Sequence, residues 1–237
     1  LLSWLADCVI VHGIQQSEVF SRQHPINPEK MHMIYLAAPE LFKQCSEFRA
    51  PLEPHTVLFF GRVQWYKGID TLIKAAPYIL RKFPDLKIVI AGAGDCSNIY
   101  QAEPDYPGLF EIHNEYIKAE EVAYYFSRAA LVVLPYKNAT QSGIIPIAYM
   151  FHKPVVATRV GSIPEVVEDG KTGLLVNAND ELALADALIE LLENPELCSS
   201  MGQTAEKLYL RIFSPSILAE KTQRVYEKTL NMYEGVL

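Results

Sequence analysis

The fold is decided by residues 131–158, which read LVVLPYKNATQSGIIPIAYMFHKPVVAT. The short apolar runs at 131–134 and 155–158 are typical of strands that are buried on both faces. Residues 142–151 between them follow small polar residues and predict a helix. A strand, a helix and a second strand in this order predict a right-handed crossover between parallel strands.

The same alternation extends over most of the chain from Thr56 onward. Further strands are predicted at residues 56–60, 87–91, 110–112 and 173–176. Further helices are predicted at residues 69–82, 119–129, 164–168, 180–193, 195–210 and 215–233. The strand at 87–91 is expected to lead into a loop. Together these elements predict an α/β fold, with a Rossmann-like parallel sheet and helices on both of its faces.

The first fifty residues predict much less regular structure. They contain at most two strands, near residues 8–11 and 31–36, and a polar helix at 15–23. These elements are too few to close a hydrophobic core. Residues 48–55 contain two prolines and no apolar period, and therefore predict a linker.

Composition disfavours several classes of protein. The chain has 237 residues, half of them hydrophobic, and a formal net charge of −7, which argues against the broad basic surface of a nucleic-acid-binding protein. Apolar runs such as 131–134 end far short of the ~20 residues that cross a bilayer, so we expect no membrane-spanning segment. The four cysteines are far apart in sequence, which favours a reducing cytoplasm over a redox motif. The six histidines show no metal-ligand spacing, so we expect no bound metal.

Glycines and polar residues follow the predicted strands at their carboxyl ends. They are Gly61-Arg62, Gly92-Ala93-Gly94, Asn114-Glu115-Tyr116, Gln141-Ser142-Gly143 and Thr158-Arg159-Val160-Gly161. In an open parallel sheet, ligands bind beyond the carboxyl ends of the strands. We therefore expect one ligand site at this edge of the sheet.

The motif with the clearest chemistry is GRVQWYKG, at residues 61–68. Gly61 lets a ligand approach the backbone closely, the Arg62 guanidinium offers a two-pronged donor, and Lys67 supplies a compact charge. Together they predict a diphosphate site. The alternative is a turn that carries two solvated basic residues.

A second polar turn, at residues 140–143, precedes the apolar helix that begins near Ile144. Small polar residues in this position are typical of a helix N-cap, and the first N–H groups of the helix would face the same edge of the sheet. A phosphate or a sugar hydroxyl could bind there. The alternative is a cap without a ligand.

Several segments in one order resemble a single family. They are Gly61-Arg62 with Lys67-Gly68-Ile69-Asp70, then residues 131–135, 153–158, 161–167 and 170–176. From about Val57 to the C-terminal helix, the chain resembles glycosyltransferase family 4, which has the GT-B fold.

The resemblance implies a retaining, metal-independent transferase that binds a nucleoside-diphosphate sugar as its substrate and needs no further cofactor. Arg62 and Lys67 match the pair that contacts the diphosphate, and both would be catalytic because their charge stabilises the leaving phosphate. Tyr116 and Ile117 match the family's base-binding backbone. The full donor-binding set expected is Gly61, Arg62, Lys67, Tyr116, Ile117, Gln141, Ser142, Gly143 and Ile144.

The resemblance also implies a division of the chain. Residues 1–50 resemble the end of an acceptor-side N-terminal domain and the crossover from it, residues 51–214 a donor-binding domain, and residues 215–237 a helix that returns toward the N-terminal domain. We expect the parent protein to carry the rest of that domain and to act in the cytoplasm or at the inner face of the membrane. With one wall of the cleft missing, we expect little or no turnover from these residues. The last helix would self-associate through an apolar stripe or pack on its own sheet.

Two positions depart from the family pattern. The family's two glutamates, which flank the phosphate-binding helix, align with Ala139 and Ile147, and neither side chain can replace a carboxylate. Gln141 and Ser142 could take over polar contacts to the donor. This departure leaves a non-catalytic nucleotide-sugar-binding module open as an alternative. A sugar-nucleotide epimerase of similar fold is a third reading, but it needs an acid and a base at the sugar that this loop lacks.

Overall fold

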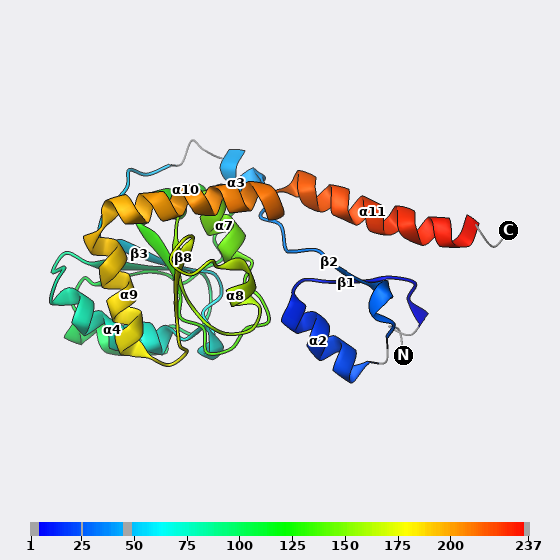
Figure 1. The fold of residues 1–237 in the computed structure, drawn as a ribbon. Coiled ribbons are helices and arrows are strands. Elements are labelled where there is room, and N and C mark those ends of the chain that lie inside the picture. Colours follow the sequence, from blue (N-terminus) through cyan, green and yellow to red (C-terminus); the bar gives the residue numbers. More distant parts are fainter. Residues whose placement is uncertain (1–4, 25, 45–48, 235–237) are drawn as a thin grey trace.

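The computed structural model describes residues 5–24, 26–44 and 49–234, with side chains up to residue 231. Its largest unit is a sheet of six parallel strands (Figure 1). The strands are β3 (Thr56–Phe60), β4 (Lys87–Ala91), β5 (Phe110–His113), β6 (Leu131–Leu134), β7 (Val155–Thr158) and β8 (Gly173–Val176). The predicted α/β fold with a Rossmann-like parallel sheet is confirmed.

The order of the strands places a crevice in the middle of the sheet. The strands lie in the order β5-β4-β3-β6-β7-β8, which corresponds to the order 3-2-1-4-5-6 of the doubly wound Rossmann fold. The chain builds outward from β3 to one side, and later outward from β6 to the other. The carboxyl ends of β3 and β6 therefore flank the position where such sheets bind ligands.

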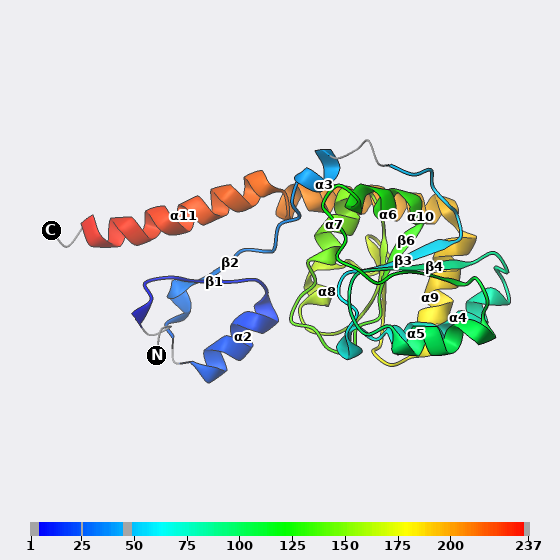
Figure 2. The same ribbon diagram turned by 180° about the vertical axis from the view of Figure 1, so that it is seen from behind.

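Helices cover both faces of this sheet, as predicted. They are α4 (Ile69–Leu80), α5 (Ser97–Ala102), α6 (Val122–Arg128), α7 (Ile144–Met150), α8 (Ile163–Val166), α9 (Glu181–Glu193) and α10 (Pro195–Ile212). Figures 1 and 2 show α4, α5 and α9 on one face and α6, α7 and α10 on the other. The central strands β3, β6 and β7 are buried along their whole length. Burial on both faces explains why their sequences are continuous apolar runs.

The loop expected after β4 is wrong, because residues 97–102 form helix α5. The Asp95 carboxylate accepts hydrogen bonds from the Ser97 hydroxyl and from the Ser97 backbone N–H, the latter at 3.0 Å. Ile99 is the buried residue of this helix. One buried side chain in six residues gives no helical period, so the sequence pattern carries no signal for it.

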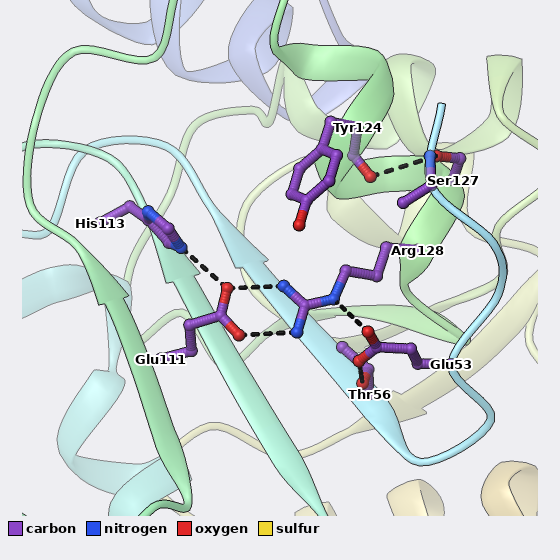
Figure 3. Close-up of polar contacts among 8 residues, drawn as sticks. Glu53, Thr56, Glu111, His113, Tyr124, Ser127 and Arg128 are labelled. Carbon is purple, nitrogen blue, oxygen red and sulfur yellow. Dashed lines mark hydrogen bonds and ion pairs between the residues drawn. The ribbon is translucent and has the colours of Figure 1, made fainter. Parts of the chain in front are cut away.

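An ion network centred on the buried Arg128 joins α6, β5 and the segment before β3 (Figure 3). Arg128, at the end of α6, is only 5% exposed. Its guanidinium donates two hydrogen bonds to the Glu111 carboxylate on β5, at 2.5 and 2.6 Å, and a third at 2.7 Å to Glu53, which precedes β3. His113 bonds to Glu111 at 2.8 Å. The Arg128 hydrogen bonds lower the pKa of Glu111 to about 2.

The N-terminal segment forms a small unit with the last helix. Strands β1 (Val9–Val11) and β2 (Met31–Met33) form a parallel pair, and helix α2 (Ile14–Gln23) lies between them in sequence. Ile34, Leu218 and Val225 form a buried apolar cluster. The last helix, α11 (Pro215–Glu234), therefore packs against the segment that contains β2.

The exposed side of α11 keeps the prediction of self-association open. Tyr226 is 65% exposed and Leu230 is 63% exposed, whereas Leu218 and Val225 are buried.

The division of the chain at residues 50 and 214 likewise stays a prediction. Phe48, in the predicted linker, lies outside the described residues.

A glutamate from the large sheet unit holds the start of α2. The Glu165 carboxylate, on α8, accepts hydrogen bonds from the backbone N–H of Ile14 at 2.7 Å and of Gln15 at 2.9 Å. These N–H groups have no partner within their own helix, and a carboxylate is the acceptor that a helix N-terminus favours. Glu165 therefore connects the N-terminal segment to α8.

We expect Glu165→Ala to loosen this connection. Loss of an N-terminal acceptor costs a helix about 1 kcal/mol, so amide hydrogen exchange in α2 should become about fivefold faster. Exchange in β3 and β6 should not change. The exposed glutamate at position 190 on α9 offers a control, Glu190→Ala. If exchange in α2 were equally fast in both variants, the Glu165 contact would contribute nothing.

Candidate active site

A pocket of about 280 Å³ lies beyond the carboxyl ends of β3, β4 and β5. It is lined by Phe60, Gly61, Arg62, Ala91, Gly92, Ala93, Glu115, Tyr116 and Ile117. Four of the predicted donor-binding residues, Gly61, Arg62, Tyr116 and Ile117, thus come together around one cavity. Tyr116 is 83% exposed, whereas Ile117 is buried.

A second pocket, of about 800 Å³, adjoins the first and shares Arg62 and Ala93 with it. Its other lining residues are Val63, Gln64, Trp65, Tyr66, Gly94 and Asp95. Trp65 is 78% exposed. Trp65 and Glu115 were not predicted as pocket residues. The signals available were the position of Trp65 within the 61–68 motif and the position of Glu115 beside Tyr116.

The 61–68 loop is fixed on both sides. The Val63 N–H donates to the Ala93 carbonyl at 2.9 Å, and the Lys137 N–H donates to the Tyr66 carbonyl at 2.8 Å. Gly68 has φ +70°, and a Cβ there would lie 1.8 Å from the Pro135 carbonyl oxygen. Only glycine therefore allows the loop to approach the end of β6 this closely.

Lys67 is held at this edge by an aromatic ring, and no acidic partner lies beside it in the described ranges. Its ammonium lies 3.6 Å from the centroid of the Tyr136 ring. Burial lowers the pKa of Lys67 to about 8. Arg62 is exposed. Within the part of the chain that the structure describes, no ion pair to a carboxylate forms at either Arg62 or Lys67. Both cations are free to bind an anion.

The 141–143 turn lies beside this edge but does not line the first pocket. Gln141 and Ser142 line a narrow space of about 10 Å³ next to Tyr35 and Leu36. The predicted side-chain cap is shifted by one residue: Gly143 is the N-cap residue and makes no side-chain hydrogen bond, and the hydroxyl that caps the start of the helix belongs to Ser142. A glycine has no side-chain oxygen to supply one.

The 141–144 region is connected to the loop at 61–68 in two ways: through the Tyr136 side chain, which contacts both Ser142 and Lys67, and directly between Ile144 and Gly61. The Ser142 hydroxyl accepts a hydrogen bond from the Ile144 N–H at 3.3 Å and lies 3.3 Å from the Tyr136 hydroxyl. A Cβ at Gly61 would lie 3.4 Å from Cδ1 of Ile144. Gly61 and Ile144 are therefore neighbours, and Tyr136 lies between Lys67 and Ser142.

The two positions without glutamate, Ala139 and Ile147, are not among the residues that line the 280 Å³ pocket. Ile147 is 7% exposed and belongs to the hydrophobic core, and Ala139 packs against that core. Glu115 is the carboxylate among the described residues that line this pocket. In the described residues, no helix is long and apolar enough to span a membrane, and no group of three or more His, Cys, Asp or Glu residues could hold a metal ion.

The fold and this pocket together define a class of protein. A doubly wound parallel sheet, with a pocket beyond the carboxyl ends of its strands, is the arrangement in which Rossmann-like proteins bind nucleotides. The model of the family described as glycosyl transferases group 1 matches residues 54–194. The chain belongs to this family.

Two curated relatives illustrate the similarity. The D-inositol 3-phosphate glycosyltransferase of Corynebacterium diphtheriae is 28% identical over 239 residues, which cover 93% of this chain and 56% of that protein. The alpha-maltose-1-phosphate synthase of Mycolicibacterium smegmatis is 30% identical over 250 residues, which cover 94% of this chain and 63% of that protein. The chain thus spans less than two thirds of the length of either relative.

Solved structures show the same fold. Sucrose-phosphate synthase from Thermosynechococcus elongatus matches with a TM-score of 0.80 at 24% identity, over 98% of this chain and 60% of that one. Alr3699/HepE from Anabaena, in complex with UDP and glucose, matches with a TM-score of 0.76 at 17% identity, over 94% of this chain and 62% of that one. The chain has the architecture of one half of a GT-B glycosyltransferase.

Proposed function

We propose that this chain is the donor-binding half of a retaining, metal-independent glycosyltransferase that transfers a sugar from a nucleoside-diphosphate sugar to an acceptor. The observation that carries the proposal is the position of Arg62 and Lys67 beyond the end of β3, two cations that have no acidic partner among the described residues. Membership of a glycosyltransferase family and a similar fold solved with UDP support it.

Each part of the donor has a place in this proposal. The base lies beside Tyr116 and Ile117 in the 280 Å³ pocket, whose small and apolar lining suits a flat ring. The diphosphate lies between the Gly61 backbone, the Arg62 guanidinium and the Lys67 ammonium. The sugar lies toward Gln141 and Ser142.

The two cations also carry the catalytic part of the proposal. As the glycosidic bond breaks, negative charge grows on the leaving diphosphate. A fixed guanidinium and a fixed ammonium stabilise this charge without having to reorganise. Losing either one costs on the order of 10²–10³ in rate, by analogy with other preorganised donors.

A non-catalytic binding module is the second candidate function. The observation that favours it is the absence of a carboxylate side chain at Ala139 and Ile147. Both candidates bind the nucleotide, so binding cannot separate them. The parent protein, given donor and acceptor, transfers the sugar under the first proposal and leaves the donor intact under the second.

The acceptor and the cellular setting belong to the proposal as well. The acceptor would bind between this half and the rest of an N-terminal domain. Free thiols at Cys8, Cys96 and Cys198 fit the reducing cytoplasm as the compartment.

A thermal-shift screen tests the proposal directly. UDP, GDP, ADP and their glucose or mannose esters are each added in excess over the chain. A ligand at a hundred times its Kd stabilises the folded state by about 2.7 kcal/mol, which raises Tm by several degrees. The nucleotides of one base, uracil, guanine or adenine, should raise Tm more than those of the other two. The proposal would be abandoned if none of the nucleotides raised Tm.

The lowered pKa of Lys67 predicts how nucleotide affinity depends on pH. The ammonium is charged below pH 8, and a bound diphosphate would raise its pKa again. Above pH 8 binding therefore has to take up a proton, and the affinity should fall by up to about tenfold per pH unit. Below pH 8 this group should contribute no pH dependence.

Calorimetry between pH 7 and 9.5 measures this effect. The control is Lys67→Arg, whose guanidinium stays charged throughout and should give a flat profile. A wild-type affinity that stayed constant up to pH 9.5 would show that Lys67 does not contact the diphosphate.

A further inference from the structure

Tyr136 contacts both halves of the proposed site. It lies two residues after the end of β6, and its side chain is fully buried. The face of its ring lies 3.6 Å below the Lys67 ammonium, and its hydroxyl lies 3.3 Å from the Ser142 hydroxyl. The diphosphate cation and the polar turn thus share one aromatic side chain.

The backbone around Tyr136 is fixed by hydrogen bonds. Its carbonyl accepts a hydrogen bond from the Thr158 hydroxyl at 2.6 Å. The next residue, Lys137, forms an ion pair with Asp70 at 2.6 Å, which fastens the end of β6 to the first turn of α4. With the backbone held in this way and the side chain fully buried, the ring gives both of its partners a defined position.

The polar contacts distinguish Tyr136 from an ordinary core residue. A phenylalanine or leucine could fill the same space without either the cation contact or the hydroxyl. A buried phenol hydroxyl needs a partner, and Ser142 is the one it has. Burial raises the pKa of Tyr136, so the hydroxyl keeps its proton and remains a hydrogen-bond donor.

We propose that Tyr136 is a positioning residue that orients the Lys67 ammonium toward the diphosphate with its ring face and orients Ser142 toward the sugar with its hydroxyl. This inference rests on the proposed function, because it assigns the diphosphate to Lys67 and the sugar to Ser142. In this inference Tyr136 touches neither the diphosphate nor the sugar, and acts on them through Lys67 and Ser142.

The two contacts can be separated by substitution. Tyr136→Phe keeps the ring and removes the hydroxyl, so it should weaken the glucose ester of the preferred nucleotide several-fold more than the free nucleotide. Tyr136→Leu removes the ring as well, so it should also weaken the free nucleotide by about tenfold, the loss expected for a desolvated cation over an aromatic ring. Calorimetry with UDP, GDP or ADP, whichever stabilises the chain most, measures both.

A pH profile distinguishes positioning from a purely structural role. Without the ring, the Lys67 ammonium loses a cation–π contact that favours its charged form, so its pKa should fall. In Tyr136→Leu the fall in affinity should therefore begin at a lower pH than in the wild type. Should this variant fail to fold, Tyr136→Phe and Ser142→Ala provide the test through a double-mutant cycle. Because they remove the same contact, their effects on the glucose ester should not add.

Tyr149→Phe is the matched control. Tyr149 is another fully buried tyrosine, and its hydroxyl bonds to the Val166 carbonyl at 3.2 Å and to the Thr172 hydroxyl at 2.7 Å, so its polar contacts are to neither Lys67 nor Ser142. It should lose stability as Tyr136→Phe does but bind nucleotide within about twofold of the wild type. Additive effects in the Tyr136 and Ser142 cycle, or a Tyr136→Phe variant that binds both ligands like the wild type, would overturn the inference. If the wild type bound no nucleotide, the proposed function itself would fail.

Discussion

Replacing both Arg62 and Lys67 by alanine is expected to lower the affinity for a nucleoside diphosphate by more than about a hundredfold. Hydrogen bonds to charged groups contribute about 1.5–3 kcal/mol each, and two of them together correspond to 10² or more in Kd. Neither cation has an acidic partner in the described structure, so their removal leaves no buried carboxylate unpaired. Calorimetry on the folded variant measures the loss.

The control for this variant changes the net charge equally at a distance. Lys171 and Arg224 are both exposed, and Lys171→Ala/Arg224→Ala removes the same two positive charges. Its affinity should stay within about twofold of the wild type, because exposed charges more than a Debye length apart are largely screened. An equal loss in both double variants would mean that net charge, and not a site at residues 62 and 67, controls binding.

Arg128→Ala is expected to have the largest effect on stability. Removing one partner of a buried ion pair costs about 3–5 kcal/mol, and we expect about 3 because Glu53 and Glu111 are partly solvated and water can reach them. The Arg128 side chain is 6% exposed, and three hydrogen bonds would be lost. Urea unfolding at pH 7 measures the free energy of unfolding.

The same variant has a predictable pH dependence. The pKa of Glu111 is lowered to about 2 in the folded chain, below its value of ~4.3 when unfolded. The contribution of ionised Glu111 to the free energy of unfolding is therefore fully present above about pH 4.3 and is lost as the pH falls toward 2. The difference in free energy of unfolding between the wild type and Arg128→Ala should become smaller over that range. This account of the network would be contradicted if that difference were below about 1 kcal/mol at pH 7, or if it were the same at pH 7 and pH 3.

Much of the fold could be predicted because its signals are local. The runs at 56–60, 131–134 and 155–158 are apolar throughout, since both faces of those strands are covered. Helix α5 left no such signal, because one buried isoleucine in six residues has no period. Strand β2 is also shorter than predicted, because it ends at Met33, although the Ile34 N–H still donates to the Val11 carbonyl at 2.9 Å.

Those parts of the candidate site whose position follows from the sheet topology alone could be predicted. The carboxyl ends of parallel strands meet at one edge, which is why Arg62 and Tyr116 line one pocket although they are 54 positions apart. The role inferred for Tyr136 depends on where a ring lies relative to Lys67, and no pattern in the sequence carries that distance. The Arg128 network was missed for the same reason, since its partners at 53 and 111 are 75 and 17 positions away.

A crystal structure of the chain with its preferred nucleoside diphosphate tests the central claim most directly. We expect both phosphorus atoms beside Gly61, with the Arg62 guanidinium and the Lys67 ammonium within about 3 Å of phosphate oxygens, and the base against Ile117. A nucleotide bound with neither cation touching the diphosphate, or bound away from the carboxyl ends of β3 and β6, would contradict it.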